Sequence, residues 1–213
     1  NPDCPERLKE LENFSYETIN IETVAKKAFA KRYLVGVKYC FKARKVFKAQ
    51  QNFDVMMVQS CPWAPFAITF AKNCVKTPVI YNSQDMFPGA SIANGAMKQK
   101  WMQKIFYMFQ KVAYRRADHI SVISEDMKQK VIEQGVPAAK ITVIPDWYDD
   151  KSVREIPWED NLFVKKYDLK KDCFYVQFAG TMGMNFDYKM VLQVAEKLKQ
   201  EKKIVFQMIG QGS

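Results

Sequence analysis

The stretch DHISVISEDMKQKVIEQGVPAAKITVIPDWY, residues 118–148, is the most informative part of the chain, because its pattern predicts a strand, a helix and a second strand with clear ends. His119–Ile123 is short and β-branched, which favours a strand, and Ser124 can cap a helix that starts with two acidic residues. Gly135 ends that helix, and Ile141–Ile144 is a further strand. Two strands joined in this way pair in parallel, so the sequence predicts an α/β sheet covered by helices.

The same pattern extends in both directions along the chain. Residues 54–58 and 77–82 are predicted strands, with a helix that begins near Pro62 between them. Residues 172–179 and 204–209 predict strands of a second unit, with a helix over 188–199 between them. Near the start, the alternation in Tyr16–Thr23 also predicts a strand.

Two basic helices are expected, over residues 26–48 and 96–116, and neither stretch contains an acidic residue. The second helix has one apolar side. Apolar residues at this spacing pack in a protein core more often than they contact lipid. That side consists of Met97, Trp101, Ile105, Met108, Phe109 and Val112. For the first helix, an ordinary solvated face and a contact with an anionic surface are both open.

The amino-acid composition indicates a globular protein, but it does not identify the binding partner. The chain of 213 residues has a net charge of +10 and is 48% hydrophobic, so it can bury a core and should meet an acidic partner. Five cysteines without short paired spacing, beside one histidine, indicate neither a disulfide framework nor a zinc site. The uncharged stretch Val55–Ala71 is too short and too rich in proline to span a membrane, and no transmembrane helix is expected.

Polar residues follow the predicted strands at the edge where parallel sheets collect ligands. Ser60 follows the first of these strands, and Gln84 and Asp85 follow the next. Asp85 stands before Pro88 and Gly89, so a turn or capping role is an equal alternative. The small-residue segment Gly89–Gly95 is expected to be a loop on this side.

A glycine-rich turn opens the second unit. Gly180, Thr181, Met182 and Gly183 lie between a strand and a helix, where backbone N–H groups and the helix dipole can hold a diphosphate. Turns of this composition are also common as purely structural elements. Lys189 is the nearby cation of suitable reach, although the helix can equally direct it to solvent.

Three segments, in this order, resemble family 4 glycosyltransferases of the GT-B architecture. They are SCPWAPFAITFAKNCVKTPVIYNSQDMFPGAS (60–91), SVISEDMKQKVIEQGVPAAKITVIPDWYD (121–149) and FAGTMGMNFDYKMVLQVAEKL (178–198). The similarity is greatest to bacterial enzymes that extend capsule, O-antigen or exopolysaccharide units. It implies Rossmann-type parallel sheets with flanking helices in two domains, of which the second is incomplete here.

The resemblance implies three parts of the chain and a role for each. Residues 1–148 would be an acceptor-side domain lacking its first strand and loop, 149–171 a linker, and 172–213 the start of a nucleotide-sugar-binding domain. Ser60, Gln84 and Asp85 would line the cleft, and Gly180–Gly183 with Lys189 would bind the donor. The family's two catalytic glutamates would lie beyond Ser213, so no catalytic residue is assigned and the fragment alone should be inactive.

The family pattern differs from this chain at two positions. Many members carry a histidine where Gln84 stands, so a histidine-dependent role is not transferred. Many also place an arginine directly after the second glycine of the donor turn, where this chain has Met184.

The expected function is therefore retaining transfer of a sugar from a nucleotide diphosphate sugar to a growing, lipid-linked surface polysaccharide. The nucleotide sugar is a co-substrate, and neither a cofactor nor a metal is expected. Peripheral contact with the inner face of the cytoplasmic membrane follows from the basic helices and the implied acceptor. The alternatives are a GT-B nucleotide-sugar epimerase and a basic nucleic-acid-binding module, although the aromatic residues fall at core spacing, so nucleic acid is not expected.

Overall fold

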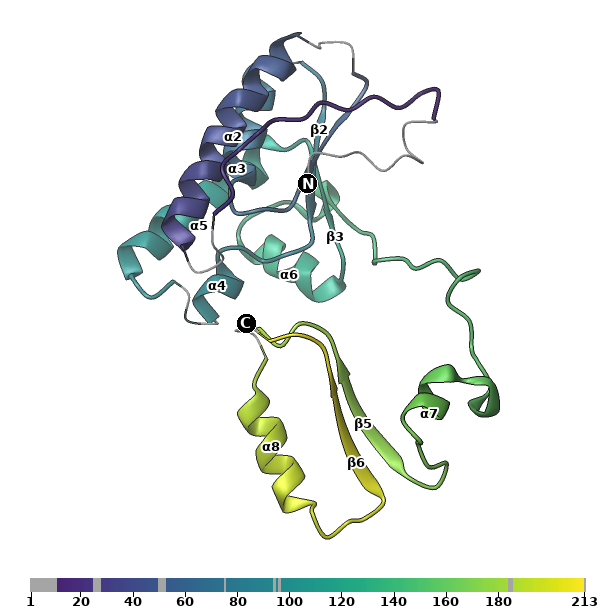
Figure 1. Ribbon diagram of the computed structural model, residues 1–213. Coiled ribbons are helices and arrows are strands. Elements are labelled where there is room, and N and C mark those ends of the chain that lie inside the picture. Colours follow the sequence, from purple (N-terminus) through teal and green to yellow (C-terminus); the bar gives the residue numbers. More distant parts are fainter. Residues whose placement is uncertain are drawn as a thin grey trace. The chain divides into compact units, whose positions relative to one another are not determined.

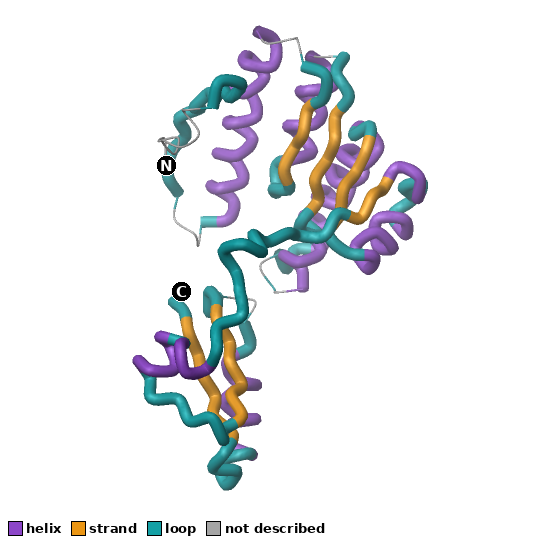
Figure 2. The backbone as a smooth tube through the Cα atoms, turned by 90° about the vertical axis from the view of Figure 1, so that its right-hand side faces the viewer, coloured by secondary structure: helices purple, strands orange, loops and turns teal. Residues whose placement is uncertain are grey.

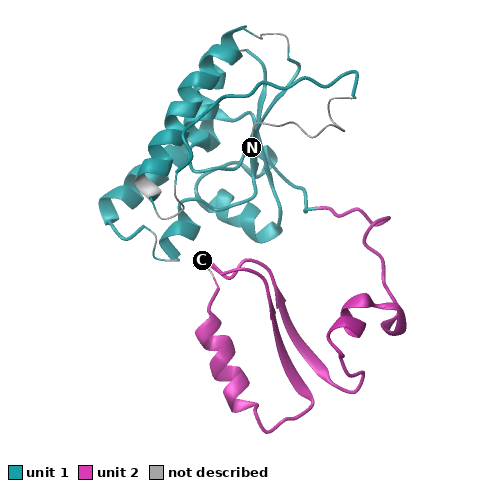
Figure 3. Ribbon diagram, in the orientation of Figure 1, with its two compact units in different colours: residues 1–146 teal, residues 147–213 magenta. Residues whose placement is uncertain are grey.

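The computed structural model describes residues 11–24, 28–49, 53–74, 76–93, 95, 97–183 and 186–212. These residues belong to two compact units, Asn1–Asp146 and Trp147–Ser213 (Figure 3). Parts of the predicted helix starts at 26 and 96 lie outside the described residues.

Unit 1 contains a parallel sheet whose strand order follows the sequence, β1-β2-β3-β4. Figure 1 labels β2 and β3 of this sheet and the helices beside it. The strands are β1 (Met56–Gln59), β2 (Val79–Ser83), β3 (His119–Val122) and β4 (Ile141–Val143). The helices of unit 1 are α2 (Phe29–Ala49), α3 (Ala64–Cys74), α4 (Gly89–Ala93), α5 (Lys100–Arg116), α6 (Glu125–Glu133) and the 3₁₀ turn η1 (Ala138–Lys140). The predicted parallel α/β sheet is confirmed.

One hydrophobic core joins the strands to helices α3, α5 and α6. It contains Tyr81 and Ile120 from the sheet, Ile68 from α3, Tyr114 from α5 and Val131 from α6, each at most 5% exposed. Since consecutive parallel strands with right-handed crossovers advance in one direction, these helices cover the same face of the sheet. Figure 2 shows the strands of this sheet with helices alongside.

Aromatic rings hold the helix layer together. Tyr33 of α2 packs against Phe106 of α5 with ring centroids 4.6 Å apart, and Phe66 of α3 lies 5.0 Å from Phe109. Phe106 also meets Phe87, which precedes α4, at 5.2 Å. Edge-on contacts of this kind contribute about 0.5–1.5 kcal/mol each beyond the area they bury. The layer therefore fixes the loop after β2 as well as the helices.

The central stretch folds as its residues indicate. The Ser124 hydroxyl accepts a hydrogen bond from the Met127 amide and caps α6. Gly135 has a φ of 88°, which is a left-handed conformation that glycine adopts without steric cost. These two residues set both ends of the crossover helix between β3 and β4.

Helix α5 buries a different face from the one predicted. Its buried residues are Phe106, Gln110, Ala113 and Tyr114. Met97 is buried as expected, but Trp101 is 65% exposed and Met108 is 54% exposed. Large apolar residues lie on both faces of the helix, so the hydrophobic pattern does not single out one of them. The buried face also has a glutamine, Gln110, at its centre, and a search for apolar residues therefore misses it. The prediction that this side of the helix packs in the core was therefore wrong for Trp101, Ile105 and Met108, which are exposed.

Two further expectations differ from the structure. Residues 16–23 form an irregular segment and not a strand; this segment runs beside α2, where the Lys42 ammonium donates to the Asn20 carbonyl at 2.8 Å. Gly89–Ala93 forms the short helix α4 in place of a loop, and the Ala90 amide donates to the Met86 carbonyl at 2.8 Å.

Unit 2 contains a second parallel pair, β5 (Phe174–Ala179) and β6 (Ile204–Ile209), joined by helix α8 (Tyr188–Lys197). The segment expected as a linker, 149–171, carries the 3₁₀ turn η2 (Trp158–Asp160) and helix α7 (Leu162–Lys166) and belongs to this unit. Within the described parts of the chain, no helix is both long and apolar enough to cross a membrane.

Asp118 ties the end of α5 to the central strand. Its carboxylate accepts a hydrogen bond from the Val79 amide at 2.6 Å. The same carboxylate forms an ion pair with Lys72 of α3 at 2.8 Å. Burial raises the pKa of Asp118, but the hydrogen bonds from Lys72 and Val79 outweigh it and hold this pKa below its usual value. The ionised carboxylate is therefore the form that stabilises the fold.

We predict that Asp118→Ala lowers the free energy of unfolding by about 1–2 kcal/mol, because a charge-assisted hydrogen bond to the backbone is lost. Since the folded pKa is depressed, this contribution is fully present above the unfolded pKa of about 3.9 and is lost as the pH falls through the folded value. Urea unfolding from pH 7 to pH 3 measures it, with the exposed Asp54→Ala as the matched control. A difference between wild type and Asp118→Ala that stays constant down to pH 3 would contradict this account.

Candidate functional site at the carboxyl edge of the first sheet

Side chains from three neighbouring strands form a hydrogen-bonded row at the carboxyl ends of β1, β2 and β3. The strand register pairs Gln59 with Asn82 and Asn82 with Ser121. The Asn82 amide nitrogen donates to the Gln59 side-chain oxygen at 2.9 Å, and the Ser121 hydroxyl donates to the Asn82 oxygen at 2.9 Å. Because side chains alternate along a strand, this row lies on the face opposite the core residues Val58 and Tyr81.

Gln84 extends this row past the end of β2. Its side-chain oxygen accepts a hydrogen bond from the Gln59 amide nitrogen. Its own amide nitrogen donates to an Asp146 carboxylate oxygen at 3.3 Å. Asp146 is the last residue of unit 1, so the row connects the sheet edge to the point where the chain leaves this unit.

The three residues predicted to line a cleft are brought together at this edge. The Ser60 hydroxyl, after β1, accepts a hydrogen bond from the Asp85 amide at 3.3 Å. Gln84 precedes Asp85 and belongs to the row described above, while the Asp85 residue is exposed. Ser60 and Asp85 thus hold the loop after β2 against the loop after β1 through the backbone of Asp85, which leaves the Asp85 carboxylate available to a ligand.

Groups with high pKa values lie beneath this edge. Burial raises the pKa of Tyr81 far above its usual value and the pKa of Tyr114 to about 12. Burial also raises the pKa of the Cys61 thiol to about 11. At neutral pH both tyrosines therefore remain neutral hydroxyl groups and the cysteine remains a thiol. The edge offers amides, hydroxyls and carboxylates, which suit binding of hydroxyl-rich molecules better than attack by a thiolate.

The predicted phosphate turn of unit 2 already uses several of its amides. The N–H groups of Gly180 and Met182 donate to the carbonyls of Ile209 and Gln211, each at 2.9 Å. The Gly183 N–H donates to the Thr181 carbonyl at 2.9 Å. These three amides continue the pairing of the β5–β6 sheet or close the turn itself, so they reach a diphosphate only if these bonds are shared or exchanged. Met184 lies outside the described residues.

The helix that follows the turn is capped by a carboxylate. The Asp187 side chain accepts a hydrogen bond from the Met190 amide at 3.1 Å at the start of α8. A negative charge there competes with an anionic ligand for the positive end of the helix. Lys189, in the first turn of α8, is exposed, and its role at a diphosphate stays a prediction.

Sequence reasoning identified the loops of the first sheet edge but missed the strand residues beside them. Gln59, Asn82, Ser121 and Asp146 were not predicted as site residues. Gln59 and Asn82 are polar residues at the ends of apolar strands, which is a usable signal. The partnership with Ser121 depends on strand register, and residue types alone do not fix that register.

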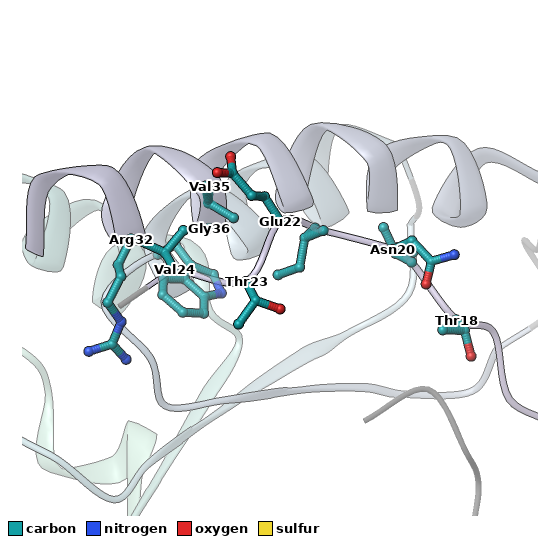
Figure 4. A pocket seen from close by; sticks show the side chains of 11 residues that line it. Thr18, Asn20, Glu22, Thr23, Val24, Arg32, Val35 and Gly36 are labelled. Atoms are coloured by element: carbon teal, nitrogen blue, oxygen red, sulfur yellow. The ribbon is translucent and has the colours of Figure 1, made fainter. Parts of the chain in front are cut away.

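A separate cavity of ≈ 420 Å³ lies between residues 18–24 and helix α2 (Figure 4). Its wall includes Gly36, where an added Cβ would lie 2.3 Å from Cε3 of Trp63, so the glycine permits close packing of the indole ring. Glu22, which also lines it, forms an ion pair with Lys31. This cavity thus combines a packing contact with an exposed ion pair and lacks the cross-strand polar row.

No group of three or more histidine, cysteine, aspartate or glutamate side chains suited to a metal ion occurs among the residues that the structure describes. The carboxylates of Asp85 and Asp146 at the sheet edge do not form such a group.

Comparison with known proteins places unit 1 in a recognised family. The family model described as "Glycosyl transferase 4-like domain" matches residues 16–147. WcaI of Escherichia coli (strain K12), which carries the name of a colanic acid biosynthesis glycosyl transferase, is 26% identical over 105 residues, covering 49% of this chain and 26% of WcaI.

Crystal structures of HepE from Anabaena resemble the fold. The complex of HepE with UDP and glucose has a TM-score of 0.60 at 13% identity and covers 83% of this chain and 44% of HepE. The complex with UDP has a TM-score of 0.57 at 12% identity, with 82% and 53% covered. The chain thus spans about a quarter of the length of WcaI and about half of HepE, and the likeness to HepE concerns the GT-B fold.

Proposed function

Because the chain belongs to the glycosyl transferase 4-like domain family, we propose that the whole protein transfers a sugar from a nucleoside diphosphate sugar to a growing surface polysaccharide. The observation that carries this proposal is the hydrogen-bonded row Gln59–Asn82–Ser121 with Gln84 at the carboxyl edge of the sheet. In open parallel sheets this edge is where ligands bind. The name of WcaI and the UDP-bearing complexes of HepE support the same class of reaction.

The residues of the two loops at this edge have direct roles in the proposed reaction, and the row of strand residues holds Gln84 in place. The oxygens of Gln84 and Asp85 accept hydrogen bonds from hydroxyl groups of the acceptor, and Ser60 fixes the Asp85 backbone. Such positioning lowers the entropic cost of bringing an acceptor hydroxyl to the donor sugar. No side chain at this edge serves as a covalent nucleophile in the proposal, in keeping with a retaining reaction in which the leaving diphosphate takes the acceptor proton.

In the donor half, the proposal assigns the diphosphate to Gly180, Thr181, Met182, Gly183 and Lys189. Lys189 would supply positive charge as the diphosphate leaves. This assignment requires the amides of the turn to be shared with the diphosphate, because three of them donate within unit 2. Neither a cofactor nor a metal enters the proposed reaction, and the nucleotide sugar is consumed as a co-substrate.

A product assay with the whole protein tests this function. The protein is incubated with UDP-glucose, UDP-galactose or GDP-mannose, with and without a lipid extract as acceptor, and with and without EDTA. We expect release of nucleoside diphosphate that depends on the acceptor, a product heavier by one sugar residue, and no effect of EDTA. The three donors cover two bases, uracil and guanine, and three hexose configurations.

Two other outcomes of that assay would replace the proposal. Conversion of the donor sugar to its epimer without any acceptor would identify an epimerase. Absence of turnover with every donor, together with salt-dependent binding of single-stranded oligonucleotides, would identify a basic nucleic-acid-binding module.

We further propose that the protein acts at the inner, cytoplasmic face of the membrane through helix α5. The exposed side chains Trp101, Ile105 and Met108 are spaced by four and three residues and therefore share one face of this helix. Lys104 and Lys111 are exposed beside them. On α2, by contrast, Arg44 lies over the Phe70 ring and Lys42 binds a carbonyl, which makes α5 the better candidate.

Vesicle sedimentation tests the membrane contact. The chain should bind anionic phosphatidylglycerol vesicles at 50 mM NaCl and release them at 500 mM, since each lysine near an anionic surface contributes about 1 kcal/mol and is screened by salt. Trp101→Ser and the pair Lys104→Glu with Lys111→Glu should each weaken binding at least tenfold, whereas Lys202→Glu in unit 2 should not. Equal binding to neutral phosphatidylcholine vesicles, or unchanged binding by Trp101→Ser, would reject this surface.

A further inference from the structure

A second cavity of unit 1 lies between the last turns of α5 and the segment that joins α6 to β4. Its volume is ≈ 500 Å³, which falls in the range of about 300–1,000 Å³ typical of small-molecule sites. The lining residues used below are Met108, Lys111, Val112, Arg115 and Lys140. Since Lys140 directly precedes β4, the cavity lies at the amino end of the sheet, away from the polar row at the carboxyl ends of the strands.

Three cations line this cavity, namely Lys111 and Arg115 on α5 and Lys140 in η1. Among the residues that the structure describes, no aspartate or glutamate lines it. Lys111 and Arg115 are exposed, and they take part in none of the ion pairs that the described residues form. These charges therefore attract an anion, and a guanidinium beside two ammonium groups suits the oxygens of a phosphate.

The backbone of α5 holds Lys140 in place. Its ammonium donates to the Tyr114 carbonyl at 2.7 Å and to the Arg115 carbonyl at 3.1 Å. An ammonium has three N–H donors, so one is left for a ligand. Burial lowers the pKa of Lys140, Asp118 opposes this effect, and Lys72 adds to it. An anion in the cavity would favour the charged form of Lys140.

The apolar part of the lining continues the exposed face of α5. Met108 is 54% exposed and belongs both to the cavity and to the apolar face proposed for the membrane contact. Val112 and Arg115 follow it at steps of four and three residues, so they extend the same face to the end of the helix. A molecule that carries an anionic group next to apolar chains fits both parts of the lining.

We infer that this cavity binds the phosphate group of an anionic membrane phospholipid. Lys111, Arg115 and Lys140 donate to the phosphate oxygens, and Met108 contacts the adjoining apolar part of the lipid. The inference rests on the proposed membrane contact of α5, to which it adds a saturable site at a defined position. A soluble phosphate ester offers the same anionic group without apolar chains, but the continuity of the cavity with the exposed apolar face favours the lipid.

Two contacts on one helix would orient unit 1 on the membrane. Because an α-helix rises 1.5 Å per residue, Trp101 and Arg115 lie about 21 Å apart along the axis of α5. A tryptophan ring settles at the level of the lipid headgroups, where the phosphates also lie. Both ends of α5 are then held at the same depth, and the helix lies along the membrane surface.

Methyl NMR on the chain labelled with ¹³C at methionine measures binding at the cavity. Met108 lines the cavity, and Met57 of β1, which is 62% exposed, reports non-specific apolar contact elsewhere. The probes are glycerol 3-phosphate and, below their micelle concentrations, dihexanoyl phosphatidylglycerol and dihexanoyl phosphatidylcholine. Phosphatidylglycerol should shift Met108 saturably and leave Met57 unchanged. Phosphatidylcholine, whose choline offsets the phosphate charge, and glycerol 3-phosphate, which has no acyl chain, should each bind at least tenfold more weakly.

Four results of this titration would overturn the inference. Equal affinity for phosphatidylcholine would leave only an apolar contact, and equal affinity for glycerol 3-phosphate would assign the cavity to a soluble phosphate ester. A single-stranded oligonucleotide that shifts Met108 and is not displaced by phosphatidylglycerol would assign the cations to nucleic acid. Absence of any saturable shift of Met108 would leave a cavity without a ligand of this class.

Two neighbouring arginines provide a matched pair of variants. Arg115→Gln removes a cation that lines the cavity, so it should weaken phosphatidylglycerol binding at least tenfold. Arg116→Gln removes the same charge one residue away, where the side chain donates to Asn73 outside the cavity, and binding should stay within twofold of wild type. Because both arginines are exposed, both variants should fold, which the unfolding midpoint checks. Equal weakening by the two variants would show a general effect of charge and would overturn the site.

These measurements separate the phosphate site from the proposals on which it rests. If Trp101→Ser loses vesicle binding while Arg115→Gln binds phosphatidylglycerol as wild type does, the membrane contact stands and the phosphate site is rejected. Sugar transfer by the whole protein is measured in a different assay and is independent of either result.

Discussion

Parallel hydrogen bonding between β1, β2 and β3 positions both the hydrophobic core and the polar row of unit 1. The register sets Gln59, Asn82 and Ser121 side by side on one face and Val58, Tyr81 and Ile120 on the other. A slip of one residue in any strand would exchange the two sets and bury the amides in the apolar core. The same strand pairing therefore forms both the polar row and the hydrophobic core. No further element is needed to place the residues of the row.

Contacts from the helices hold the loops at this edge of the sheet in place. Aromatic contacts from Phe106 to Tyr33 and Phe87 fix the loop after β2 against the helix layer. Asp118 joins α3, through Lys72, to the start of β2, through the Val79 amide. Since packed interiors resist deformation, these contacts limit the freedom of Ser60 and Asp85 at the opposite ends of the strands.

Much of the fold could be predicted from the sequence because its signals are local. Ser124 and Gly135 mark both ends of α6, and short β-branched runs mark the strands. The buried face of α5 could not be predicted, since Gln110 occupies the centre of that face while Trp101 and Met108 remain exposed. The irregular course of residues 16–23 was also missed, because alternation alone does not supply a partner strand. Ser60, Gln84 and Asp85 could be placed at the sheet edge from their position after strands, and their role there stays a prediction. The partners of Gln84 could not be predicted, because they depend on the strand register and on the path of the chain to Asp146.

In the proposed reaction, the polar row at the sheet edge orients the acceptor for sugar transfer, so the value of kcat/KM for the acceptor depends on this row. It is measured with the whole protein as wild type, as Gln84→Leu, and as Gln129→Leu, an exposed change on α6. Gln84→Leu should lower kcat/KM by about 10–100-fold, because a missing amide contact to a hydroxyl in the transition state costs roughly 1.4–2.7 kcal/mol, while its unfolding midpoint and the activity of Gln129→Leu stay close to wild type. A kcat/KM of Gln84→Leu within twofold of wild type would show that the row does not orient the acceptor.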